Sequence, residues 1–108
     1  MNGLMTDLER EVVDVVAREN WQGFRTDGLK VLRRENTGAG RYTYLADGHN
    51  QTLPDGSYSA QGRMIELRGV RNGLGFVVEA SSSRISHIEL FTFGNDEWDG
   101  SEEVWKIV

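Results

Sequence analysis

The apolar residues near the start of the chain recur at helical spacing. One stripe of a helix would collect Leu8, Val12, Val15 and Val16, with charged residues between them. Thr6 has Glu9 three residues further on, which is the pattern of a capping box at a helix N-terminus. The spacing therefore predicts a helix over residues 7–20. Its valines are poor helix formers, so this helix needs packing against the rest of the fold.

After Gly28 the pattern changes to short runs of β-branched and aromatic residues, which are typical of strands. The runs predicted as strands are 29–34, 41–45, 63–67, 74–80, 84–93 and 104–108. Turns rich in glycine or serine separate them at 36–40, 69–73 and 81–83. Segment 84–93 has apolar residues on both faces, which indicates a central position in the sheet.

One helix followed by about six strands predicts a single α+β domain over residues 1–108. We expect the helix to pack on a bent, mainly antiparallel sheet, with Trp21 and Trp105 in the core. Residues 46–59 hold the only proline and two Asp-Gly pairs, so they are predicted to form a long loop. Loops of this length in small domains are often functional.

Charge is unevenly distributed along the chain. Residues 1–20 carry five acidic and two basic residues, residues 21–95 carry seven and nine, and residues 96–108 carry five and one. Both ends are therefore acidic and the middle is mildly basic. The bland interpretation is that the acidic ends are ordinary solvated faces. The sharper one is an acidic surface that steers a cationic partner toward the protein.

Several classes of protein are disfavoured by composition. The chain has no cysteine, which excludes disulfides and cysteine-based metal centres, and we expect no cofactor or metal and a cytoplasmic location. No apolar run approaches the ~18 residues that predict a membrane span. The net charge of −5 disfavours binding to nucleic acid phosphates.

The arginines could still form a basic face of the kind found on RNA-binding sheets. It would combine Tyr42, Tyr44 and Phe76 with Arg33, Arg34, Arg41, Arg63, Arg68, Arg71 and Arg84. Four glutamates, Glu35, Glu66, Glu79 and Glu89, are interspersed through the same strands. Cross-strand ion pairs are the commoner outcome of such a pattern.

The densest group of charged residues follows the 84–93 segment. Five carboxylates lie within eight residues around one tryptophan, and we predict a partner-binding surface there. Its members are Asp96, Glu97, Trp98, Asp99, Glu102 and Glu103. Tryptophan ringed by polar residues resembles an interface hot spot. The alternative is that Trp98 folds back to cap the core.

Two other sets of residues suggest chemistry. His87 lies two residues before Glu89 and so on its face of the strand. With Tyr42 or Tyr44 and an arginine (Arg33, Arg34 or Arg84), this pair could cleave RNA by general acid–base catalysis. The bland interpretation is a half-buried histidine on a polar strand face. His49 lies near Asp47 and Asp55 in the 46–59 loop, where ordinary turn chemistry is favoured over a metal site.

Three segments together resemble a group of small, uncharacterised bacterial proteins. These segments are residues 31–43, which contain Thr-Gly-Ala-Gly, residues 72–78, which contain Gly-Leu-Gly-Phe, and the strand 84–94 followed by Trp98 in an acidic end. The resemblance covers roughly residues 29–98 and rests mostly on turn glycines and strand apolar residues. The resemblance implies the α+β fold predicted above and a bacterial or phage origin, and it suggests an immunity-type role. It carries over no functional residues.

The sequence favours a non-enzymatic, acidic binding protein. We expect an immunity-type or inhibitor protein that neutralises a basic partner such as a toxin nuclease, because acidic inhibitors associate quickly with basic targets. Two alternatives stay open. One is a small hydrolase or nuclease that uses His87, Glu89 and an arginine, and the other is a small-ligand-binding domain gated by residues 46–59. A homodimer also stays open.

Overall fold

The computed structural model describes residues 3–108, and the predicted helix is present in it as α1, Asp7–Asn20. The capping box is confirmed. Thr6 Oγ1 accepts a hydrogen bond from the Glu9 backbone N–H at 3.1 Å, and Glu9 Oε1 accepts one from the Thr6 N–H at 2.9 Å. The predicted apolar stripe is buried almost completely. The helix is therefore held by packing, as the low helix propensity of its valines requires.

Within residues 3–108 the α+β fold consists of this helix and one open, antiparallel, seven-stranded sheet. The strands are β1 Leu29–Asn36, β2 Gly40–Asp47, β3 Gly56–Tyr58, β4 Ile65–Leu67, β5 Val70–Ser81, β6 Arg84–Thr92 and β7 Trp105–Ile107. Their order is β1-β2-β6-β5-β4-β7, and β3 pairs with residues 78–80 of β5, whereas β4 pairs with residues 70–74. β6 thus has the central position that its sequence predicts.

Two predicted boundaries were wrong. Residues 46–59 are not one loop, because β3 lies within them and pairs with residues 78–80 of β5. The 69–73 segment is not a turn either, since β5 starts at Val70, which pairs with Leu67. The reversal takes only Arg68 and Gly69, with Gly69 at φ +93°, a conformation that glycine adopts without strain.

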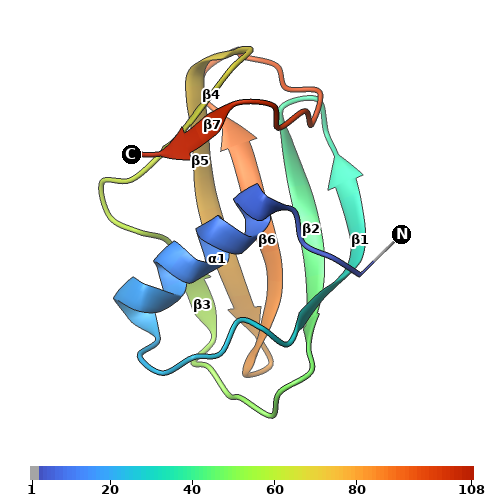
Figure 1. Ribbon diagram of the computed structural model, residues 1–108, viewed down its shortest axis with the longest axis vertical. Coiled ribbons are helices and arrows are strands. Elements are labelled where there is room, and N and C mark those ends of the chain that lie inside the picture. Colours follow the sequence, from blue (N-terminus) through green and yellow to red (C-terminus); the bar gives the residue numbers. More distant parts are fainter. Residues whose placement is uncertain (1–2) are drawn as a thin grey trace.

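The sheet has one covered and one open face. Figure 1 shows α1 lying across the sheet in front of β5 and β6. Along β2, Thr43 and Leu45 are buried toward the helix, and Tyr42 and Tyr44 are half-exposed on the opposite face. No helix of the described part covers that opposite face. Trp21 is buried as predicted, and Trp105 packs partly buried against the core.

Among residues 3–108 no helix is long and apolar enough to cross a membrane.

Candidate functional site

The tryptophan of the acidic segment is part of the core. Trp98 is 4% exposed, its backbone N–H donates to the Gly38 carbonyl at 2.9 Å, and its Nε1 donates to the Ser101 carbonyl at 2.8 Å. The Arg41 guanidinium lies 5.0 Å from the centre of its ring. Trp98 therefore folds back to cap the core, as the alternative interpretation of the sequence predicts. Its indole is not accessible as an exposed anchor.

Two acidic residues of the segment have partners within the protein. Asp96 Oδ2 accepts hydrogen bonds from the backbone N–H and the side-chain amide of Asn72, at 3.0 and 3.1 Å. Glu102 forms an ion pair with Arg41, which is itself buried. These two carboxylates fasten the segment to β5 and β2. They are less available to a partner than the sequence alone suggests.

The remaining three carboxylates of the segment, Glu97, Asp99 and Glu103, are exposed. They line one groove of about 530 Å³ together with Gly38, Arg68, Gly69, Trp98 and Ser101. We call this the acidic groove. Within the described residues none of the three forms an ion pair, and only Asp99 has a hydrogen bond, from the Ser101 N–H at 2.9 Å. The structure thus gathers four of the six predicted contacts around one hollow, the buried Trp98 and the three exposed carboxylates.

A buried carboxylate lies between the helix and the sheet. Glu9 is fully buried, and its oxygens accept bonds from Arg34 Nη2 and Nε at 2.7 and 2.9 Å. Arg41 Nη2 and Thr43 Oγ1 donate to Glu9 Oε2 at 2.9 and 2.7 Å. Burial by itself raises the pKa of Glu9, but the bonds from Arg34, Thr43 and Thr6 and the charge of Arg41 outweigh it and lower that pKa to about 2.

Sequence reasoning missed this network because each member has an ordinary local explanation. Glu9 completes the capping box, and Arg34 and Arg41 belong to strands. Arg41 also donates to the Gly100 carbonyl at 3.3 Å, besides its ion pair with Glu102. The network therefore links α1 and β2 to the acidic segment, and it positions the backbone that carries the acidic groove.

The open face of the sheet brings together much of the predicted catalytic set. The ring of His87 lies 5.6 Å from that of Tyr42 and 5.5 Å from that of Tyr44. The Arg33 guanidinium stacks 4.0 Å above the centre of the Tyr44 ring. Arg33 also pairs with Glu35 at 2.7 Å. Among the described residues, however, the only hydrogen-bond partner of the His87 ring is Ser86 Oγ, 3.3 Å from Nδ1, so no proton-transfer pair with Glu89 is formed.

Other members of the predicted sets lie elsewhere. Arg34 and Arg41 are beneath the helix and Phe76 is buried on that same side, so the continuous basic face does not form. Arg84 donates at the end of the sheet to the His49 carbonyl at 3.3 Å and to Asn50 Oδ1 at 3.1 Å.

The loop histidine takes part in local turn contacts. Its backbone N–H donates to Asp47 Oδ1 at 2.8 Å, and its Nε2 lies 3.0 Å from Asp27 Oδ1. Within residues 3–108 no three histidine or carboxylate groups converge as metal ligands would. A hollow of about 320 Å³ lies between residues 20–24 and 51–54. It is the place where the predicted loop meets the end of α1.

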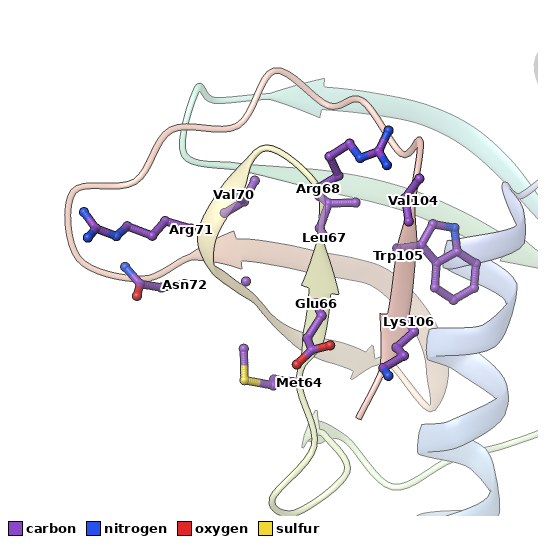
Figure 2. Close-up of a pocket in the computed structure, with 11 residues that line it drawn as sticks. Met64, Glu66, Leu67, Arg68, Val70, Arg71, Asn72, Val104, Trp105 and Lys106 are labelled. Carbon is purple, nitrogen blue, oxygen red and sulfur yellow. The ribbon is translucent and has the colours of Figure 1, made fainter.

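A second groove lies at the β4–β7 edge of the sheet. Figure 2 shows it beside the β4–β5 turn, with Arg68, Arg71, Glu66 and Lys106 around it and the apolar side chains of Val104 and Leu67 between them. Its volume is about 590 Å³. Three basic residues against one acidic residue make it unsuited to a basic partner. It adjoins the acidic groove, since Arg68 lines both.

Comparisons with known protein families, with curated proteins and with solved structures gave no match. The resemblance to the small bacterial group is therefore untested.

Proposed function

We propose that this chain is a non-enzymatic, cytoplasmic binding protein of the immunity or inhibitor type. Its partner is a basic protein, such as a toxin nuclease, and the acidic groove formed by Glu97, Asp99 and Glu103 is the contact surface. The observation that carries the proposal is the exposure of these three unpaired carboxylates around one hollow. The net charge of −5 adds a long-range attraction for a cationic protein.

The arrangement of the acidic segment supports this role. Burial and polar contacts hold three residues of the segment in place, namely Trp98, Asp96 and Glu102. The backbone between them is therefore fixed at these points. Carboxylates on an anchored backbone lose less conformational entropy on binding than those of a loose acidic tail. A fixed charge pattern also contributes to the choice of partner as well as to the rate of encounter.

The test uses charge reversal at positions with no role in holding the fold. Glu97 and Glu103 are the best sites, because the oxygens of Asp96 and Asp99 accept backbone hydrogen bonds. Wild type and Glu97→Lys/Glu103→Lys are immobilised and exposed to a lysate of the cells that encode the chain. We expect wild type to capture a basic protein at low salt. The variant should associate with that purified protein more slowly, on the order of 10- to 100-fold, with a flatter salt dependence.

Glu11→Lys/Glu19→Lys is the matched control. It changes the net charge equally, but on α1 and away from the acidic groove, and it removes one exposed hydrogen bond, from the Gln61 N–H to Glu19 Oε1 at 3.4 Å. The control should retain most of the association rate, because steering depends on where the charge lies and not only on its sum. Equal capture by wild type and the groove variant, or equal loss in both variants, would remove the support for this surface.

A further inference from the structure

The open face of the sheet is an ordered grid of side chains. Cross-strand partners on β2 and β6 are Tyr44 with His87, Tyr42 with Glu89, and Gly40 with Phe91. On β5 the same three β6 residues are opposite Glu79, Val77 and Gly75. Cross-strand neighbours on one face lie about 5 Å apart, so their side chains meet. Glu89 is therefore at the middle of the grid.

Glu89 has aromatic neighbours but no ionic partner. His87 and Phe91 lie two residues before and after it on β6, Tyr42 faces it across β2, and Val77 faces it across β5. It is half-buried, and within residues 3–108 no Arg, Lys or His forms an ion pair with it. The negative charge of Glu89 raises the pKa of Tyr42, with burial as the second cause and a hydrogen bond between the two side chains as the third.

Two glycines let neighbouring groups pack closely beside this carboxylate. The ring of Phe91 leans over Gly75, where a Cβ atom would lie 2.5 Å from Phe91 Cε2 and Cζ. Gly40, the partner of Phe91 on β2, lies against the β6 backbone, because a Cβ atom there would clash with the Leu90 carbonyl oxygen. A hollow of about 390 Å³ lies at this point, with Gly40, Tyr42, Glu89 and Phe91 among the residues that line it, and we call it the Glu89 hollow.

From this geometry we infer that the Glu89 hollow receives an arginine side chain of the basic protein partner. A guanidinium can lie flat against the rings of Tyr42 and Phe91 while it donates two hydrogen bonds to the Glu89 carboxylate. Lysine offers a point charge without the planar stacking, so arginine fits this hollow better. The inference rests on the proposed function, because it assumes that the partner is a basic protein.

The position of the hollow is consistent with one continuous interface. The β1–β2 turn borders both surfaces, with Gly38 lining the acidic groove and Thr37, Ala39 and Gly40 lining the Glu89 hollow. A partner that covers this turn contacts unpaired carboxylates on both sides of it. The acidic groove then supplies the steering, and the hollow supplies a site for one inserted side chain.

The inference can be tested without the natural partner. The peptides Gly-Arg-Gly, Gly-Lys-Gly and Gly-citrulline-Gly are titrated into the labelled protein, and the backbone amide signals are followed by NMR. We expect the arginine peptide to shift the signals of Gly40, Tyr42 and Phe91 with a dissociation constant on the order of millimolar. The lysine peptide should bind about fivefold more weakly. The citrulline peptide, which keeps the shape and loses the charge, should cause no saturable shift.

The matched variant is Glu89→Gln, which keeps the size of the side chain and removes its charge. It should weaken binding of the arginine peptide about fivefold or more, whereas Glu97→Lys/Glu103→Lys should retain peptide binding at Gly40 and Phe91. Equal shifts with citrulline, or unchanged binding by Glu89→Gln, would overturn the inference. Because the peptide test does not use the captured protein, the inference can fail while partner capture through the acidic groove persists, and the reverse outcome is equally distinguishable.

Discussion

Glu9 and Glu89 are glutamates on opposite faces of the same sheet. Glu9 is fully buried beneath α1 and accepts bonds from Thr6, Arg34, Arg41 and Thr43. Glu89 is half-buried on the open face and has no ion pair in the described part of the chain. A charge whose partners all lie within the protein stabilises the fold, whereas a partly desolvated charge without partners can gain them from another molecule.

Glu9 and Glu89 should differ most in how much each contributes to the stability of the fold. Replacing Glu9 by Gln leaves Arg34 without its counter-charge and Arg41 with Glu102 alone, which is costly in a largely buried site. We expect Glu9→Gln to lower the free energy of unfolding by about 3 kcal/mol. Glu89→Gln should change it by less than about 0.5 kcal/mol, because no described ion pair is lost. Urea unfolding of both variants measures the difference. Equal losses of unfolding free energy would show that Glu9 contributes no more to the stability of the fold than Glu89 does.

The acid stability of the protein gives a second measure of the same network. The pKa of Glu9 is about 2 in the folded protein against its ordinary 4.5. A lowered pKa means that the stabilisation is complete above pH 4.5 and is lost as the pH falls toward 2. The shift corresponds to about 3 kcal/mol.

Glu9→Gln lacks this titration, so it is the reference for the measurement. The gap in unfolding free energy between wild type and Glu9→Gln should be widest above pH 4.5 and should close toward pH 2. Glu102, which pairs with Arg41 beside Glu9, is unchanged in both proteins. A gap that stays constant over this range would mean that Glu9 is not ionised in the native state.

The sequence predicted the parts of the fold that follow from local pattern. The helix, its capping box and the central position of β6 all follow from periodicity and turn residues. The Glu9 network depends instead on an irregularity in β1. Leu29 and Val31 face the core, and strict alternation would place Arg33 beside them. The register shifts between Val31 and Arg33, so Arg34 turns toward Glu9 instead, and Arg33 stacks on Tyr44.

The candidate site was predictable only in part for a similar reason. The position of His87 and Glu89 on one strand face follows from the two-residue period of a strand. Which residues face Glu89 from β2 and β5 depends on long-range register, which no local pattern specifies. The acidic segment illustrates the same limit. Its carboxylates are evident in the sequence, but the burial of Trp98 and the pairing of Glu102 depend on Arg41, about 60 residues away.

The most specific test of the open face concerns Gly75, and its expected effect on stability is smaller than that of Glu9→Gln. In Gly75→Ala the new methyl group would lie 2.5 Å from the Phe91 ring, so the ring must move. We expect the free energy of unfolding to fall by about 1 kcal/mol, because a flexible ring yields more easily than backbone. The displaced ring should fill part of the Glu89 hollow and weaken binding of the Gly-Arg-Gly peptide severalfold. The Glu9 network should be unaffected, so the acid dependence of stability should match wild type. A shifted Phe91 ring signal with unchanged peptide affinity would mean that Phe91 is not a wall of the hollow.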